Sequence, residues 1–135
     1  MGKKRASESD QPAGDGAKKI LIVDDDVEIV DTLQAALEAN GYEVVYARDG
    51  TQGLVMIERE RPDAMILDMM MPKRSGFLVL EKLRRTREEM LPVVMITANE
   101  GSRHKAYAEM LGVKAYLHKP FPMDQLLETV ARILH

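Results

Sequence analysis

The chain has 135 residues, 45% of them hydrophobic and 30% charged, with a formal net charge of −3 and no cysteine. This length is typical of one domain with a proper core, and the composition is that of a globular protein. The lack of cysteine excludes disulfides and thiolate metal sites and fits a reducing compartment, while the charge gives no reason to expect direct nucleic acid binding. No apolar run has transmembrane length and the N-terminus lacks a signal-peptide core, so we expect a cytoplasmic protein without membrane contact.

The N-terminal residues differ from the rest of the chain. Residues 1–17 are polar, small and rich in glycine, and they include the basic cluster Lys3-Lys4-Arg5. Such a segment cannot bury enough apolar surface to offset the entropy lost on ordering. We therefore expect a disordered tail over residues 1–17 and a single folded domain over residues 18–135.

Three uninterrupted apolar runs predict central strands of a parallel sheet. They are Ile20–Val23, Ala64–Leu67 and Pro92–Ile96, and none of them alternates with polar residues. Strands buried on both faces have this pattern. Two less apolar runs, Tyr42–Ala47 and Ala115–His118, are suited to the edges of the same sheet.

Helical patterns follow each of the five predicted strands. The predicted helices are Val27–Asn40, a helix opened by the capping box Asp49–Gln52 and ending near Arg59, Gly76 to about Arg87, Ser102–Leu111, and a last helix beginning at Pro122. Five alternating strand and helix units predict an α/β fold: a flavodoxin-like (βα)5 three-layer sandwich whose parallel sheet has the order 2-1-3-4-5. The basic run from Arg84 to Arg87 is expected to be a solvated helix end.

Polar side chains follow the predicted strands at one edge of the sheet. Asp24 and Asp25 follow the first strand, Asp68 ends the third, Thr97 ends the fourth and Lys119 follows the fifth. The carboxyl ends of parallel strands lie at one edge, where α/β proteins bind ligands. Carboxylates, a hydroxyl and one ammonium group indicate a phosphate and metal site, and oxygen ligands suit Mg²⁺. The next residue, Asp26, is predicted to be a helix N-cap.

These motifs resemble the receiver domain of two-component response regulators, of the single-domain chemotaxis type. The resemblance covers about residues 18–135, in the order and approximate spacing of that family. The matching residues are Asp24 and Asp25, Asp68 with Met71-Pro72 and Gly76, Thr97-Ala98, Tyr116, and Lys119-Pro120-Phe121.

The resemblance implies the chemistry of a phosphorylation switch. Asp68 would accept a phosphoryl group from a phosphohistidine on a sensor histidine kinase or a histidine phosphotransfer protein. Asp25, Asp68 and the carbonyl of Met70 would ligate Mg²⁺ directly, with Asp24 acting through water, and Lys119 would stabilise the phosphoryl oxygens. The domain would catalyse its own phosphorylation and dephosphorylation without being an enzyme in the ordinary sense.

The resemblance also implies how the signal leaves the domain. Thr97 would move toward the phosphoryl group and the ring of Tyr116 would rotate inward, changing the surface formed by the fourth helix, fifth strand and fifth helix. That surface would bind a downstream protein target, or a second copy in a phosphorylation-dependent homodimer of an otherwise monomeric chain. Met70 and Asn99 occupy positions that bear on the lifetime of the phosphate.

Other interpretations remain open. The chain could be a phosphorylation-independent binding module with the same fold, or the receiver fragment of a longer regulator or hybrid histidine kinase. A phosphatase of the haloacid dehalogenase type also uses a strand-end Asp with Mg²⁺, but it needs a second Asp where this chain has Met70. A nucleotide or flavin site is disfavoured because no Gly-rich loop follows the first strand. The spacing of His104, His118 and His135 does not suggest a metal site.

Overall fold

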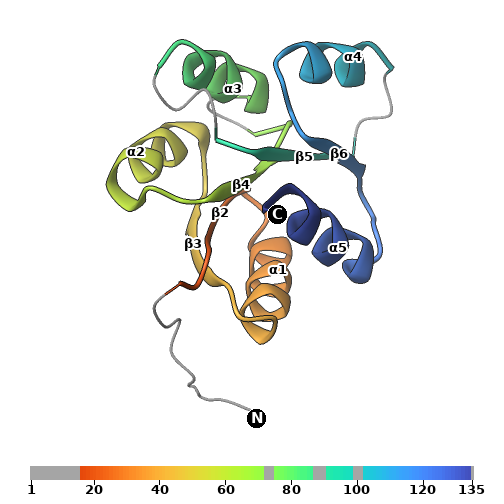
Figure 1. Ribbon diagram of the computed structural model, residues 1–135. Helices are drawn as coiled ribbons and strands as arrows, with labels where there is room; N and C mark the ends of the chain where they lie inside the picture. The colour runs from red at the N-terminus through yellow and green to blue at the C-terminus, as the bar shows by residue number, and fades with distance from the viewer. Residues whose placement is uncertain (1–15, 72–74, 87–90, 99–101, 135) are drawn as a thin grey trace.

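A computed structural model describes residues 16–71, 75–86, 91–98 and 102–134 (Figure 1). Strands and helices alternate along this part of the chain. In order they are β2 (Lys19–Val23), α1 (Val27–Ala39), β3 (Glu43–Ala47), α2 (Gly50–Glu60), β4 (Ala64–Asp68), α3 (Gly76–Arg84), β5 (Val93–Thr97), α4 (Ser102–Met110), β6 (Ala115–His118) and α5 (Met123–Leu134). The elements therefore match the predicted series, and most boundaries lie within a residue of the predicted ones.

The strands form one parallel sheet in the order β3-β2-β4-β5-β6. Counted along the chain, this order is 2-1-3-4-5, which confirms the predicted fold class. The two strands with the weakest apolar patterns, β3 and β6, lie at the edges, as expected. Every residue of β4 and β5 is buried, because both strands have neighbours on each side and helices on both faces.

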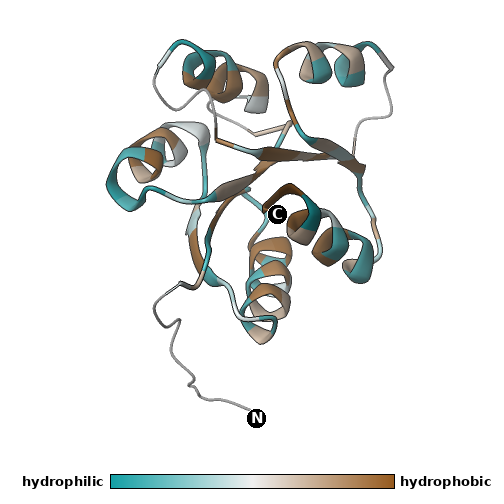
Figure 2. Ribbon diagram, viewed as in Figure 1, coloured by the Kyte–Doolittle hydropathy of each residue, from teal (hydrophilic) through white to brown (hydrophobic). Residues whose placement is uncertain are grey.

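Alternate side chains of the strands build two cores on opposite faces of the sheet. Helices α1 and α5 cover one face, and α2, α3 and α4 cover the other (Figure 1). Figure 2 shows the hydrophobic strands between helices whose hydrophobic sides face the sheet and whose hydrophilic sides face outward. The core under α1 and α5 includes Ile20, Ile22, Leu33, Leu37, Ile66, Ile96, Leu126 and Val130. The core on the other face includes Leu21, Val23, Met65, Leu67, Met69, Leu80, Val93 and Met95.

Side-chain caps set the beginnings of the helices at the edge where the strands end. The carboxylate of Asp26 accepts hydrogen bonds from the backbone N–H groups of Glu28 and Ile29, which confirms the predicted N-cap of α1. Asp49 caps α2 by accepting from the N–H of Gln52 at 2.8 Å. The side chain of Gln52 in turn accepts from the N–H of Arg48, so the reciprocal bond of the capping box lies one residue earlier than in the standard form.

The basic run at the end of α3 differs from the prediction. Helix α3 ends at Arg84, earlier than expected, and the Arg84 side chain is partly buried. Its guanidinium donates hydrogen bonds to the carbonyl oxygens of Leu111 (2.6 Å), Gly112 (3.1 Å) and Leu91 (3.4 Å). The prediction of a solvated helix end is therefore wrong for Arg84. The physical reason is tertiary: the last carbonyls of α4 lack intrahelical partners and lie beside this arginine.

Two predictions concern the chain outside the sheet. The predicted tail covers residues 1–17, and all but the last two of these lie outside the described residues, so it stays a prediction. Within the described residues, no helix combines the length and the apolar character that crossing a membrane would require.

Candidate functional site

The carboxyl ends of four strands bring the predicted site residues to one edge of the sheet. Asp24 directly follows β2 and donates its backbone N–H to the carbonyl of Ala47 at 3.1 Å. Asp68 is the last residue of β4, and Thr97 is the last residue of β5. Lys119 follows β6 and donates its N–H to the carbonyl of Thr97 at 2.7 Å. The convergence predicted from the strand pattern is therefore found.

Three carboxylates form an acidic cluster at this edge. Asp24, Asp25 and Asp68 each place an oxygen within 4.8 Å of the other two. The side chains of Asp24 and Asp68 are buried, with residue exposures of 0% and 3%, whereas Asp25 is exposed at the mouth. Like charges at this separation repel, and burial strengthens the repulsion. A cation held by this cluster would offset that repulsion.

Lys119 supplies a positive charge to this cluster. Its Nζ lies 3.0 Å from Oδ2 of Asp24 and 3.6 Å from Oδ1 of Asp68. The other oxygen of Asp24, Oδ1, accepts the backbone N–H of Asp26 at 2.9 Å. Both oxygens of Asp24 therefore accept hydrogen bonds, one from a charged group and one from the backbone. These bonds offset the cost of burying the carboxylate.

Asp68 is the least compensated of the three carboxylates. Burial, followed by the negative charge of Asp24, raises the pKa of Asp68 from 3.8 to about 7, although Lys119 and a hydrogen bond from the N–H of Met70 act in the opposite direction. One ammonium group shared between two buried carboxylates leaves the cluster with excess negative charge. An oxygen-only donor set with excess negative charge fits a hard divalent cation, so these residues could bind a metal ion such as Mg²⁺.

A glycine allows the chain to return close to Asp68. The N–H of Gly76 donates to the carbonyl of Met69 at 2.8 Å, and this bond closes the loop between β4 and α3. A Cβ atom at position 76 would lie 2.5 Å from the carbonyl oxygen of Asp68 and 2.9 Å from Cα of Met69. No side chain larger than hydrogen fits there without movement of the backbone. Gly76 belongs to the predicted motif, but its steric role required the structure.

Thr97 and Tyr116 lie together beside the cluster. Thr97 is fully buried and Tyr116 of β6 is partly buried. Burial raises the pKa of the Tyr116 hydroxyl, and a side-chain hydrogen bond with Thr97 lowers it by a smaller amount. The same hydroxyl lies 3.7 Å from the sulfur of Met69. The resemblance implied that Thr97 and Tyr116 act together, but it did not predict their hydrogen bond. The contact with Met69 had no signal in the sequence, because it joins β6 to the residue after β4 across an intervening strand.

Met70, Asn99 and the three histidines have different positions. Met70 is 58% exposed at the mouth of the cluster, and its N–H donates to Oδ1 of Asp68 at 3.3 Å. Asn99 and His135 lie outside the described residues. His104 packs against the ring of Phe77, and His118 ends β6 on the exposed side. Within the described ranges, the three aspartates are the one set of potential ligands close enough to share a metal ion.

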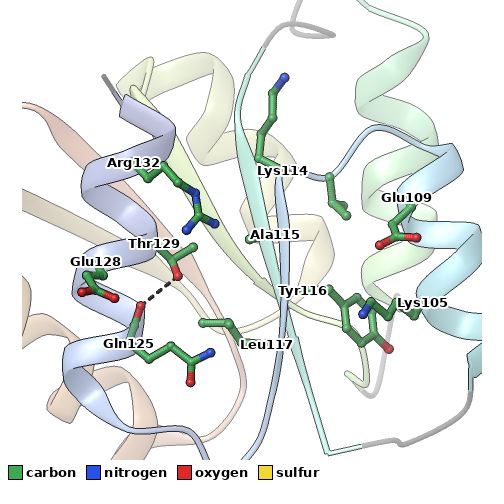
Figure 3. Close-up of a pocket in the computed structure, with 11 residues that line it drawn as sticks. Lys105, Glu109, Lys114, Ala115, Tyr116, Leu117, Gln125, Glu128, Thr129 and Arg132 are labelled. Atoms are coloured by element: carbon green, nitrogen blue, oxygen red, sulfur yellow. Dashed lines mark hydrogen bonds between the residues drawn. The ribbon is translucent and has the colours of Figure 1, made fainter.

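Two hollows lie near the site. One, of about 500 Å³, lies between α1 and the segment after β6, and it is lined by Glu28, Ile29, Thr32, Leu33, Ala98, Lys119, Pro120, Phe121 and Met123. The other, of about 340 Å³, follows β6 between α4 and α5 (Figure 3). Its lining is more polar and includes Tyr116, Lys105 and Arg132. The first hollow shares Lys119 with the acidic cluster, and the second shares Tyr116 with the Thr97 contact.

Comparison with known proteins identifies the family. The model of the response regulator receiver domain matches residues 20–131. Response regulator MprA of Mycobacterium leprae (strain TN) is 39% identical over 116 residues, which are 86% of this chain and 50% of that protein. MprA of Mycobacterium tuberculosis (strain CDC 1551 / Oshkosh) matches with the same identity and coverage. The chain thus spans about half the length of the curated relatives it matches.

Solved structures agree with this match. The Vibrio cholerae chemotaxis protein CheY4 is 32% identical with a TM-score of 0.82, covering 87% of this chain and 99% of that one. A CheY-like response regulator receiver domain protein from Methanospirillum hungatei JF-1 is 34% identical with a TM-score of 0.82, covering 87% of this chain and 94% of that one. The chain therefore belongs to the response regulator receiver domain family of two-component systems.

Proposed function

We propose that this chain is a phosphorylation-dependent switch of a two-component phosphorelay, with Asp68 as the phosphoryl acceptor. One observation carries the proposal: a buried carboxylate at the end of a central strand lies between two further aspartates and the ammonium group of Lys119. A purely structural aspartate in this place would cost stability, since its pKa is raised by burial and by Asp24. A phosphoryl transfer that uses the negative charge of Asp68 would account for its burial at this place.

The proposed reaction is an in-line phosphoryl transfer. An oxygen of the Asp68 carboxylate attacks the phosphorus of a phosphohistidine, the P–O bond forms as the P–N bond breaks, and the imidazole keeps the electron pair and takes a proton from solvent. Mg²⁺, when bound by Asp25, Asp68 and the carbonyl of Met70 with Asp24 acting through water, supplies charge neutralisation. Lys119 moves its ammonium group from the carboxylates to the phosphoryl oxygens, which carry the developing charge.

The hollow beside Lys119 supports a protein donor, either a sensor histidine kinase or a histidine phosphotransfer protein. Its lining is largely apolar, with Ile29 on α1 and Phe121 and Met123 on the other side. An apolar helix face seated there would reach the mouth of the acidic cluster, because Lys119 belongs to both. Contacts of this kind orient the phosphohistidine for in-line transfer.

The signal is proposed to pass through Thr97 and Tyr116. The Thr97 hydroxyl, now hydrogen-bonded with Tyr116, would instead donate to an oxygen of the phosphoryl group on Asp68. Loss of this partner would change the position of the Tyr116 ring, which lines the groove between α4 and α5 (Figure 3). Output would then be a shift between two populations of the α4-β6-α5 surface, read by a downstream protein or a second copy of the chain.

Two positions are proposed to set the lifetime of the phosphorylated state. Met70 is exposed above Asp68 and has no polar side-chain atom able to orient an attacking water. Asn99, which lies outside the described residues, carries an amide and would take that role by the family resemblance. We expect Met70→Gln to shorten the half-life of the phosphorylated protein by about tenfold. This is less than the roughly hundredfold or more of a general base, because an amide can orient the attacking water but cannot take its proton. The decay of the phosphorylated mass after removal of the donor measures this, and an unchanged half-life would rule out a role for position 70.

The test of the proposed function is the intact mass of the protein after incubation with acetyl phosphate, with and without Mg²⁺. We expect a gain of one phosphoryl group, only with Mg²⁺ and only with Asp68 present. Asp68→Asn is the control, and Asp63→Asn is the matched control, since Asp63 is an exposed aspartate at the other end of β4.

The second part of this test replaces acetyl phosphate by a protein that carries a phosphohistidine. The switch is supported if either donor adds phosphoryl mass to the wild type and to Asp63→Asn but not to Asp68→Asn. No gain with either donor contradicts it and favours a phosphorylation-independent binding module. Release of phosphate from ordinary phosphomonoesters would instead favour a phosphatase.

A further inference from the structure

Helix α4 has few contacts with the sheet that it covers. Ala108 is fully buried, His104 is partly buried, and the other described side chains of α4 are exposed. Tyr107 and Met110, its large apolar residues, are 38% and 80% exposed. A single buried alanine gives a helix little hydrophobic stabilisation, so other contacts must hold α4 in position.

Helix α3 supplies those contacts along its length. The hydroxyl of Tyr107 on α4 donates a hydrogen bond to the carboxylate of Glu81 on α3. The ring of Phe77 on α3 meets the ring of Tyr107 edge to face, with centroids 5.1 Å apart, and the ring of His104 lies 5.8 Å from it. The hydrogen bond raises the pKa of Tyr107, because loss of its proton would place two negative charges together.

The far ends of the two helices are joined as well. Arg84, the last residue of α3, donates to the carbonyls of Leu111 and Gly112 at the end of α4, and to the carbonyl of Leu91 before β5. Three successive turns of α3, at Phe77, Glu81 and Arg84, therefore contact α4 or its C-terminus. Together these contacts make α3 and α4 one unit.

The beginning of α3 lies directly against the phosphoryl acceptor. Its first residue, Gly76, has no room for a Cβ because the carbonyl oxygen of Asp68 would be 2.5 Å away. Its N–H is bonded to the carbonyl of Met69. A displacement of the Asp68 backbone would therefore move the first residue of α3 as well, since the packing between them leaves no space to absorb it.

We propose that α3 is a second link from Asp68 to the output surface, in addition to the Thr97 and Tyr116 pair, and that Glu81 and Tyr107 are the positioning residues that couple α3 to α4. The inference rests on the proposed function of Asp68. It predicts that α4 responds to phosphorylation through a hydrogen bond that touches neither the phosphoryl group nor Thr97. The element that takes two positions in this proposal is α4, because its contacts with α3 hold it in place more than its own small buried face does.

The test is backbone amide hydrogen exchange of residues 76–84 and 102–110, measured before and after phosphorylation with acetyl phosphate and Mg²⁺. Tyr107→Phe keeps the ring against Phe77 and removes the hydroxyl alone. The matched control is Tyr46→Phe on β3, a tyrosine that is 47% exposed and makes no hydrogen bond to another described residue. The gain of phosphoryl mass is recorded for every variant.

We expect phosphorylation to change the exchange of both helices in the wild type. In Tyr107→Phe the mass gain and the response of α3 should persist, while the response of α4 falls by about fivefold, the low end of coupling between sites. Glu81→Gln should reduce the response of α4 because a neutral amide oxygen is a weaker acceptor, and the double variant should lose no more than Tyr107→Phe alone. A structural role alone would raise the exchange of α4 equally in both states and leave its response to phosphorylation unchanged.

Distinct outcomes separate the two proposals. An α4 response in Tyr107→Phe equal to that of the wild type, or lost equally in Tyr46→Phe, overturns the second link while leaving Asp68 as the acceptor. No gain of phosphoryl mass in the wild type overturns the proposed function, and the link with it.

Discussion

Single residues in the acidic cluster make stability depend on pH. The pKa of Asp68 is raised to about 7 in the folded protein, mainly by burial and then by Asp24, whereas in the unfolded chain it is near 3.8. Between these values the folded state binds more protons than the unfolded state, so the free energy of unfolding falls as pH rises from about 4 to about 7. Above about pH 7 the ionised Asp68 carboxylate destabilises the fold in full, and below about pH 4 this destabilisation is absent.

The prediction is that Asp68→Asn stabilises the metal-free protein at pH 7.5 by about 4 kcal/mol and changes its stability little at pH 4. The pKa of Asp68 rises from 3.8 to about 7, and one pKa unit corresponds to about 1.4 kcal/mol. Urea unfolding in EDTA across this range measures it. Asp31→Asn, at an exposed position of α1, serves as the control. A wild type whose stability is flat between pH 4 and 7 would contradict the shifted pKa.

Lys119 stabilises the cluster, whereas the ionised Asp68 carboxylate destabilises it. Its Nζ is 3.0 Å from Asp24, whose side chain is fully buried. Replacing Lys119 by Met leaves that carboxylate without its charged partner, and removing one member of a buried pair costs about 3 to 5 kcal/mol. We expect Lys119→Met to lower the urea midpoint at pH 7.5 and to slow phosphoryl gain from acetyl phosphate. Lys114→Met, at an exposed lysine, should leave both unchanged.

At the scale of elements, the packing of α3 against β4 decides the geometry around Asp68. A methyl group at position 76 would meet backbone atoms at 2.5 and 2.9 Å, and backbone cannot rotate away as a side chain can. We expect Gly76→Ala to destabilise the fold by about 3 kcal/mol, the upper range for overpacking. Thermal unfolding measures the loss, and the displaced loop should also slow phosphorylation of Asp68.

Gly53→Ala is the matched control for this prediction. Position 53 lies within α2, and a Cβ there would lie 3.1 Å from side-chain methyl carbons of Val23. A small shift of Val23 relieves that contact, and alanine is favoured over glycine in a helix by about 1 kcal/mol. A change within about 1 kcal/mol is therefore expected. Equal losses at both positions would show that the approach to Asp68 has no special constraint.

At the scale of the whole molecule, an ion bound by the three aspartates would link metal binding to folding. A ligand that binds only the folded state stabilises it by RT ln(1 + [L]/Kd), about 2.7 kcal/mol at one hundred times Kd. The carboxylates converge only when β2 and β4 are paired, so the unfolded chain has no such site. We expect MgCl2 to raise the melting temperature of the wild type by several degrees at constant ionic strength.

Asp25→Asn tests the site without disturbing the buried pair, because Asp25 is exposed. It should weaken the stabilisation by Mg²⁺ while leaving the metal-free melting temperature nearly unchanged. An equal rise with Mg²⁺ in Asp25→Asn and in the wild type would show that the ion acts elsewhere on the chain.

Much of this protein could be predicted from local patterns. Unbroken apolar runs identified the central strands, and the weaker runs with Glu43 and His118 identified the edges. The position of a polar residue at the end of each run placed Asp24, Asp68, Thr97 and Lys119 at one edge, because parallel strands end together. Caps such as Asp26 were readable because they act within one turn of helix.

Contacts between distant segments had no such signal. The strand ends placed Lys119 near the aspartates but did not indicate that its ammonium group lies closer to Asp24 than to Asp68. The approach of Gly76 to the carbonyl of Asp68 and the three bonds of Arg84 had no signal at all. Arginine at a helix end is usually solvated, and only the neighbouring end of α4 made Arg84 an exception. The sequence by itself determined the fold class and the residues of the site, because periodicity and strand ends are local properties. The tertiary structure alone decided which charges pair and which helix holds α4, because both depend on distances that arise only when the sheet has formed.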